Sequence, residues 1–426
     1  MQGMQRLSAE VRQYIIITGN YWAFTLTDGA LRMLVVLHFH QLGYQALDIA
    51  LLFLFYEFFG VVTNLFGGWL GARWGLNKTM NIGLALQVVA LCMLLVPTSL
   101  LSIAWVMAAQ ALSGIAKDLN KMSAKSAIKT LVPSDAEGAL FKWVAALTGS
   151  KNTLKGVGFF LGGALLAILE FRGALLAMAL GLSAVWIASL VMLKQDLGKA
   201  KNKPKFKDIF SKSPAINDLS AARLFLFGAR DVWFVVALPV YLSSTFGWDH
   251  WLVGSFLATW IILYGFVQSF APRLITFRKD SARGKVPGGS SAFKWALPLT
   301  VVPALIALLL GLDLGAGSKL NAAFGLDQFD FAQWTLIVGL AIFGILFAIN
   351  SSLHSYLIVS YAAADGVSLD VGFYYMANAM GRLIGTVLSG WVFQSWGLIA
   401  CLWVSTAFVF LAAIISLRLP THSFRK

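Results

Sequence analysis

Apolar stretches long enough to cross a lipid bilayer recur from one end of this 426-residue chain to the other. A transmembrane helix needs about 20 consecutive, mostly apolar residues. Hydrophobic residues make up 58% of the chain and charged residues only 12%, whereas soluble domains carry about 25% charged residues. The sequence therefore excludes a water-soluble fold and predicts an all-α, polytopic membrane protein.

A sliding window of about 19 residues predicts twelve transmembrane helices. Several of these spans are longer than a perpendicular crossing requires, which is typical of tilted helices. The predicted spans lie at 14–37, 49–71, 79–96, 102–120, 143–169, 174–193, 220–244, 252–272, 295–312, 333–357, 371–394 and 397–418.

A Lys-rich connection at 194–216 separates an N-terminal half at 1–193 from a C-terminal half at 217–426, with six spans in each. The halves echo each other weakly, because Gly29-Ala30-Leu31-Arg32 in the first span resembles Gly228-Ala229-Arg230-Asp231 in the seventh. Two joined six-helix halves describe the major facilitator architecture, in which the substrate binds near the midplane between the halves.

Basic residues gather in the connections on one side of the predicted membrane. The positive-inside rule then places both chain termini in the cytoplasm. Much of the formal net charge of +14 thus reflects topology, and we expect no nucleic-acid partner. The basic residues are Arg6, Arg12, Arg73, Lys78, those of 117–142, 194–212 and 273–294, and Arg418, Arg425 and Lys426.

Several other functional classes lack the residues that their chemistry needs. The chain has two cysteines, Cys92 and Cys401, too few for a thiolate metal site, and clustered acids or His-x-x-His groups are missing. Neither a P-loop nor a filter-like repeat is present. We therefore expect neither an enzyme, an ATP-driven pump nor a channel, and no cofactor or metal.

The string Gly68-Trp69-Leu70-Gly71-Ala72-Arg73-Trp74-Gly75 resembles the Gly-x-Leu-x-Asp-Arg-x-Gly signature of the major facilitator superfamily. The resemblance implies a gating role for Gly68, Arg73 and Gly75. Ala72 replaces the signature Asp, so another acid takes its place or the lock is weaker. The glycines of the fifth span resemble an antiporter motif and are equally typical of close helix packing: Gly149, Gly156, Gly158, Gly162 and Gly163.

Longer strings resemble the organoarsenical efflux permeases of arsenic-resistance operons. They are 19–32 (GNYWAFTLTDGALR), 113–125 (SGIAKDLNKMSAK) and 149–152 (GSKN). The resemblance implies a multi-pass protein of the bacterial inner membrane that exports 1-arseno-3-phosphoglycerate and so confers arsenate resistance. It also implies a functional link to the glycolytic glyceraldehyde-3-phosphate dehydrogenase that makes this substrate.

Ionisable groups inside the predicted spans are mostly cationic, and such groups normally face a cavity or a partner. Lys151 and Lys155 are four residues apart in an apolar segment, where like charges share one helix face and repel. A phosphate-like anion would compensate them. The predicted substrate-binding residues are Arg32, Lys117, Lys151, Lys155, Arg230 and Arg382, with Asn20, Tyr21, Asn152 and Asn378 as polar neighbours.

Acidic residues in the spans suggest a route for coupled protons. Desolvation favours the protonated form of a carboxylate that no cation holds, so Glu57 and Asp231, followed by Asp28, are the proton-coupling candidates. Asp28 and Arg32 also have the i,i+4 spacing of a local ion pair. Arg230 and Asp231 are adjacent, so we expect them to point apart and not to neutralise each other.

Four lysines, Lys117, Lys121, Lys125 and Lys129, recur every fourth residue and form a stripe on one helix face. For Lys125 and Lys129 we expect snorkelling towards water and lipid headgroups. The charge balance predicts a secondary transporter for a small organic oxyanion, and the resemblance implies that this oxyanion is exported. The alternative is an exchanger or uptake permease for sugar phosphate, phosphoglycerate or inorganic phosphate.

The predicted orientation can be checked by cysteine labelling in intact cells. A cysteine that replaces Lys203 should be shielded from a membrane-impermeant reagent, because the linker is predicted to be cytoplasmic. A cysteine that replaces Asn321 should react. External labelling at position 203 would contradict the topology.

Overall fold

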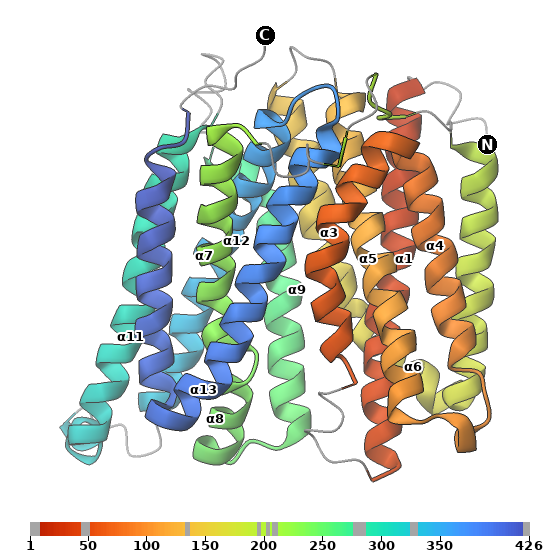
Figure 1. Ribbon diagram of the computed structural model, residues 1–426. Coiled ribbons are helices and arrows are strands. Elements are labelled where there is room, and N and C mark those ends of the chain that lie inside the picture. Colours follow the sequence, from red (N-terminus) through yellow and green to blue (C-terminus); the bar gives the residue numbers. More distant parts are fainter. Residues whose placement is uncertain are drawn as a thin grey trace.

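The computed structural model describes residues 9–43, 52–132, 137–193, 197–201, 205–206, 212–275, 287–323 and 331–420, and its regular elements there are helices. They run roughly along one common axis (Figure 1). The helices are α1 (Ala9–Gln41), α3 (Leu54–Trp74), α4 (Leu76–Met93), the short 3₁₀ helix η2 (Thr98–Leu100), α5 (Ile103–Leu131), α6 (Glu137–Met192), α7 (Pro214–Phe234), α8 (Ala237–Phe246), α9 (His250–Ile275), α11 (Gly289–Ala323), α12 (Phe331–Tyr361) and α13 (Val367–Ser416).

Two of the helices are double-length and turn at a single residue. In α6 the break is at Glu170, with φ 58° and ψ −179°, and in α13 it is at Gly397, with φ 78° and ψ −175°. The break at Glu170 falls between the predicted spans 143–169 and 174–193, and Gly397 is the first residue of the last predicted span, 397–418. When α6 and α13 count as two segments each and α7 with α8 as one, the described residues form twelve segments of bilayer length, as predicted.

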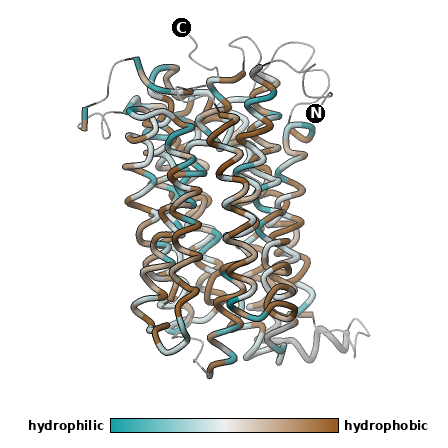
Figure 2. Tube along the Cα trace, turned by 90° about the vertical axis from the view of Figure 1, so that its right-hand side faces the viewer, coloured by the Kyte–Doolittle hydropathy of each residue, from teal (hydrophilic) through white to brown (hydrophobic). Residues whose placement is uncertain are grey.

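The described helices differ in how apolar they are. Seven of them, with α7 and α8 taken together, are long and apolar enough to cross a membrane by length and composition. Side chains such as Val191, Ile168 and Val387 are 82%, 76% and 63% exposed, as expected for a surface that meets lipid. Figure 2 shows apolar residues along the length of the bundle. The helices α1, α3 and α5 are more polar and carry many of the candidate site residues.

The two halves of the chain lie side by side, with α1 to α6 on one side and α7 to α13 on the other (Figure 1). Contacts between α3 and α13 and between α6 and α9 join them. We call the end of the bundle where α1 begins and α13 ends the N/C end. Which compartment this end faces stays a prediction.

The predicted linker is described only in part, since 194–196, 202–204 and 207–211 lie outside the described residues. Its described residues 197–201 cross the turn between α3 and α4: the Leu76 amide donates to the Leu197 carbonyl (2.8 Å), and the Ala200 amide donates to the Ala72 carbonyl (2.9 Å). The predicted domain boundaries stay a prediction.

Glycines allow α1 and α6 to approach until their backbones touch. A methyl group added at Gly158 would lie 2.7 Å from the Leu26 carbonyl oxygen, and one at Gly29 would lie 2.7 Å from the Lys155 carbonyl oxygen. In the second half, Gly228 and Gly385 bring α7 and α13 together in the same way. The packing interpretation of the glycine-rich fifth span is thereby confirmed at Gly158, and the antiporter interpretation stays open.

This packing predicts different effects for two neighbouring glycines of α6. Gly158→Ala should lower the free energy of unfolding by about 1–3 kcal/mol, because the methyl group overlaps the α1 backbone. Gly163→Ala is the matched control, since its methyl group would meet only Leu37 Cδ1, at 3.7 Å. Thermal unfolding of the purified variants measures both, and equal stability would contradict the packing role.

Candidate functional site

Charged side chains from six helices meet near the middle of the bundle. We call them the central cluster, and seven bases face four acids in it. Because uncompensated charge inside a membrane protein is costly, this excess of cations needs an explanation. The acids are Asp28, Glu57, Asp118 and Asp231, and the bases are Arg32, Lys117, Lys121, Lys151, Lys155, Arg230 and Arg382.

A continuous series of ion pairs runs through the cluster from one half to the other. Glu57 Oε1 accepts from Arg32 Nη2 (3.2 Å) and from Arg382 Nη2 (3.4 Å). Arg382 Nε also donates to Asp231 Oδ2 (3.1 Å), and Asp231 Oδ1 accepts from Arg230 Nη2 (2.5 Å). The series therefore connects α1, α3, α13 and α7, and the Glu57–Arg382 pair joins the two halves.

The two acids of this series differ in burial. The Glu57 side chain is 33% exposed, whereas that of Asp231 is 0% exposed. Each of the two acids is held by two arginines. Their role in proton coupling stays a prediction.

Two expectations about local ion pairs are wrong. Asp28 does not pair with Arg32 one turn away: it accepts hydrogen bonds from the Tyr56 hydroxyl, at 2.7 and 2.9 Å, and Arg32 turns to Glu57. Arg230 and Asp231 do pair, although they are adjacent, because the long Arg230 side chain folds back onto the carboxylate.

The lysine stripe on α5 points into the protein along its whole length. Lys121 Nζ pairs with Asp118 (2.5 Å), and Lys117 Nζ lies 3.8 Å from the centre of the Tyr56 ring and 4.0 Å from Asp118. The snorkelling expectation for Lys125 and Lys129 is wrong. Their side chains are buried, and they donate to Thr148 Oγ1 and to the Ser360 carbonyl, both at 2.8 Å.

Lys151 and Lys155 lie in the middle of the first segment of α6, and both are half-buried. Among the described residues, neither has a carboxylate within 4.0 Å. The charged groups that act on Lys151 are all cations, namely Lys121, Lys125, Arg382 and Lys117, whereas both Arg32 and Asp28 act on Lys155. Positive charge is therefore concentrated on this face of α6.

The four predicted polar neighbours are distributed around the cluster. Asn20 Nδ2 donates to Ser189 Oγ (2.9 Å) inside the first half, so it packs helices together. Tyr21 is buried, with Asp118 and Asp28 among the charges that act on it. Asn152 donates to Gln268 across the halves, and Asn378 Oδ1 accepts from Arg223 Nε (2.8 Å).

Sequence analysis did not identify Tyr56 and Gln268. Tyr56 holds Asp28 by a hydrogen bond, and its ring lies against both Arg32 and Lys117. Gln268 connects Asn152 to the Tyr264 hydroxyl (2.8 Å). Both residues are uncharged, and the folding of the chain is what brings them next to the site residues. The charge pattern of the sequence therefore gave no sign of them.

The residues of the predicted gating motif lie at the N/C end, where α3 meets the first turns of α13. Ser368 Oγ donates to the Gly68 carbonyl (2.7 Å), and a methyl group at Gly68 would lie 3.0 Å from Gly372 Cα. Gly75, with φ 98°, forms the tight turn from α3 into α4. The signature Asp has no counterpart at Ala72, and in this structure the Ser368 hydroxyl joins α3 to α13.

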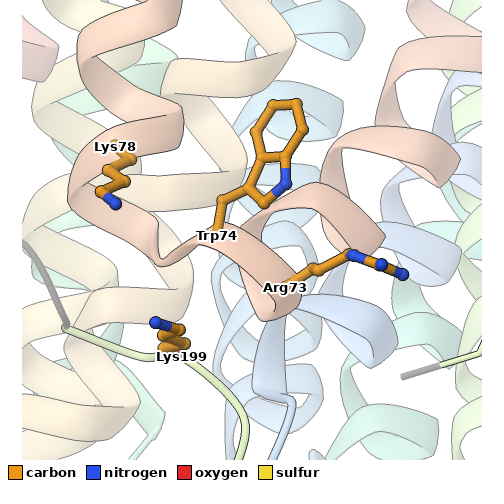
Figure 3. Close-up of a pocket in the computed structure, with 4 residues that line it drawn as sticks. All are labelled: Arg73, Trp74, Lys78 and Lys199. Carbon is orange, nitrogen blue, oxygen red and sulfur yellow. The ribbon is translucent and has the colours of Figure 1, made fainter. Parts of the chain in front are cut away.

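Arg73 of the same motif lies away from this contact. Its guanidinium stacks on the Trp69 ring at 5.2 Å. Together with Trp74, Lys78 and Lys199 it lines a pocket of about 370 Å³ at the N/C end, in which Arg73 and Lys78 extend to opposite sides of Trp74 (Figure 3). This pocket is separate from the central cluster.

The hydrogen bonds identified between the halves, among the described residues, lie at the level of the central cluster or nearer the N/C end. Lys129 to Ser360 and Ser368 to Gly68 are nearest that end. Asn152 to Gln268, Thr153 to Ile262 and Arg382 to Glu57 lie at the level of the cluster. Among the described residues, hydrogen bonds therefore join the halves both at the N/C end and at the level of the central cluster.

Residues 15–324 match the family model of the Major Facilitator Superfamily. A search of curated proteins finds no match. The crystal structure of the human organic anion transporter MFSD10 (TETRAN) is similar, with 16% identity, a TM-score of 0.72 and coverage of 96% of this chain and 100% of that chain.

Two further solved structures have the same architecture. A bacterial homologue of the iron transporter ferroportin in an outward-facing state has 13% identity, a TM-score of 0.68 and coverage of 95% and 98%. The E. coli fucose:proton symporter FucP has 11% identity, a TM-score of 0.66 and coverage of 95% and 98%. At these identities the likeness shows the fold.

The burial of the two acids predicts unequal effects of the same chemical change. Asp231→Asn should cost about 3–5 kcal/mol of stability, because two arginines lose their buried partner. Glu57→Gln should cost much less, since a third of this side chain is exposed. Thermal unfolding of the two purified variants compares them, and a Glu57→Gln protein as unstable as Asp231→Asn would contradict this assignment.

Proposed function

The chain belongs to the major facilitator superfamily of membrane transporters, and on that premise we propose that its central cluster binds a small organic oxyanion with several negative charges. It acts as a secondary transporter and not as an enzyme. We further propose that it exports 1-arseno-3-phosphoglycerate across a bacterial inner membrane, with the N/C end in the cytoplasm. A glyceraldehyde-3-phosphate dehydrogenase would supply this substrate.

The uncompensated pair Lys151 and Lys155 carries the proposal. Two half-buried ammonium groups on one helix face repel each other, and no carboxylate among the described residues lies within 4.0 Å of them. A phosphate or arsenate group between them would remove this repulsion. Neutral sugars and organic cations would not.

Arginines of both halves extend the site. Arg32 Nε is buried without a hydrogen-bond partner among the described residues, so it has a donor for a further oxyanion. The side chains of Arg32 and Arg382 are 25% and 30% exposed, and both hold the exposed Glu57. An incoming oxyanion can therefore compete with Glu57 for these guanidinium groups, each of which can bind it with two hydrogen bonds.

Competition between the substrate and Glu57 would also weaken the contact between the two halves. The Glu57–Arg382 pair joins α3 to α13 and hence one half to the other. When a substrate oxyanion takes the place of the Glu57 carboxylate on Arg382, this direct bond between the halves is lost. Substrate binding would thus favour the rearrangement by which the two halves move relative to each other.

The choice of an arsenate ester over a phosphate ester is supported by sequence resemblance alone, because both present similar tetrahedral oxyanions. The alternative is an exchanger or uptake permease for sugar phosphate, phosphoglycerate or inorganic phosphate. Cells that contain the chain and the dehydrogenase should tolerate arsenate and lose cellular arsenic, and either protein alone should not suffice. Net accumulation of phosphoglycerate by such cells would favour the alternative.

Removal of one lysine charge tests the binding site. Lys151→Gln should weaken the binding of 3-phosphoglycerate to the purified protein by roughly ten- to a hundred-fold, the effect of losing one charge-assisted contact of about 1.5–3 kcal/mol. Lys142→Gln is the matched control, because Lys142 lies exposed on the same helix. This variant should bind 3-phosphoglycerate with the wild-type affinity.

Calorimetry with 3-phosphoglycerate and with a neutral sugar measures both variants. The sugar should not bind any of them. A folded Lys151→Gln protein that retains the wild-type Kd for 3-phosphoglycerate would remove Lys151 from the site.

A further inference from the structure

A second group of polar side chains lies nearer the N/C end than the central cluster. We call it the inner cluster: Lys125 on α5, Arg223 on α7, Ser355 on α12, and Tyr374 and Tyr375 on α13. All five are almost completely buried, with 0% to 3% of each residue exposed. They belong to four helices from both halves, so they surround a position on the interface between the halves.

The cations of the inner cluster have only neutral partners. Lys125 Nζ donates to Thr148 Oγ1 (2.8 Å), and Arg223 donates to Asn378 Oδ1 (2.8 Å) and the Ser351 carbonyl (3.1 Å). Among the described residues, no carboxylate lies within 4.0 Å of either cation. A buried charge without a counter-ion is strongly unfavourable, so an anion would stabilise this group.

Three hydroxyl groups of the inner cluster also have unused hydrogen-bonding capacity. Ser355 interacts with the hydroxyls of both Tyr374 and Tyr375, but none of these three buried groups makes a hydrogen bond of regular geometry among the described residues. The Tyr375 ring lies 5.0 Å from Lys125 Nζ, and the Tyr374 ring lies 5.3 Å from the Arg223 guanidinium carbon. Buried donors without regular hydrogen bonds beside buried cations are what an oxyanion site provides before the anion arrives.

The inner cluster lies close to the central cluster along the bundle axis. Seven residues separate Tyr375 from Arg382 on α13 and Arg223 from Arg230 on α7, which is about 10 Å along a helix. Lys151 lies between the two groups, since its charge interacts with Lys125 and with Arg382. This spacing is about the length of a small molecule that carries a charged group at each end.

We propose that the inner cluster is a second oxyanion subsite, which binds one charged end of a two-ended anion while the central cluster binds the other, and this subsite rests on the function proposed above. It specifies the substrate class further. The preferred substrate carries anionic groups at both ends of a short chain, as a phosphoglycerate does, and a one-ended phosphate uses only one of the two clusters.

Closure at the N/C end makes the inner cluster inaccessible in this structure. The Lys129–Ser360 and Ser368–Gly68 hydrogen bonds join the halves on that side of it. When these contacts open, a substrate that enters from the N/C end meets the inner cluster before the central cluster. If that end is cytoplasmic, the inner cluster is the first of the two subsites to bind an exported substrate.

Two ligands that differ in one charged group test the second subsite. 3-Phosphoglycerate has a phosphate and a carboxylate, whereas glycerol 3-phosphate has the phosphate alone on a three-carbon chain. Lys125→Gln and Lys151→Gln should each weaken 3-phosphoglycerate binding by roughly ten-fold or more. Glycerol 3-phosphate should lose affinity in only one of these two variants, and Lys142→Gln should bind both ligands normally.

A purely structural role of Lys125 predicts another pattern, in which affinity for both ligands falls together with thermal stability. Should Lys125→Gln not fold, Tyr375→Phe replaces it in the comparison, because it removes one hydroxyl and keeps the ring against the lysines. Tyr375→Phe should weaken the binding of 3-phosphoglycerate about two- to ten-fold.

Three results have distinct meanings. A folded variant of the inner cluster with unchanged affinity for 3-phosphoglycerate would overturn the second subsite. So would equal losses for both ligands in both lysine variants, which indicate one site or a structural effect. A wild-type protein that binds neither anion would instead overturn the proposed function itself.

Discussion

Positive charge inside a membrane-spanning bundle must be compensated, and the ion-pair series around Glu57 and Asp231 is the main compensation in this protein. Arg382 is its centre, because it binds both acids and thereby connects α3 to α13 and α7. The acids available are fewer than the bases, so compensation is incomplete. The cations left over, above all Lys151 and Lys155, are the basis of the proposed anion site.

Close helix packing is what brings these charges within reach of each other. Gly29 and Gly158 let the α1 and α6 backbones touch next to Lys155, and Gly228 does the same for α7 and α13 beside Arg230. Larger residues at these positions would push the helices apart. The glycines thus determine the geometry of the charged site as well as the stability of each half.

Burial divides the polar residues between holding the bundle together and binding. Asp231 is fully buried and holds two arginines, whereas Glu57 is partly exposed and is the acid that the proposed substrate anion would displace from its arginines. Lys129 is buried and donates across the halves at the N/C end, while Lys151 is half-buried and has no carboxylate within 4.0 Å among the described residues. The role of a lysine or a carboxylate therefore depends on how deeply its side chain is buried and on which side chains surround it.

The sequence alone determined the fold class, the number of spans and the excess of cations, because hydrophobic length and residue type are local properties. Only the tertiary structure decided which charge meets which. Asp28 accepts a hydrogen bond from Tyr56 instead of pairing with Arg32. Arg230 folds back onto Asp231, and Lys125 points into the protein instead of towards lipid headgroups. The physical reason is that a long side chain pairs with whatever the neighbouring helices present within its reach, and helix neighbours are not encoded by spacing along one helix.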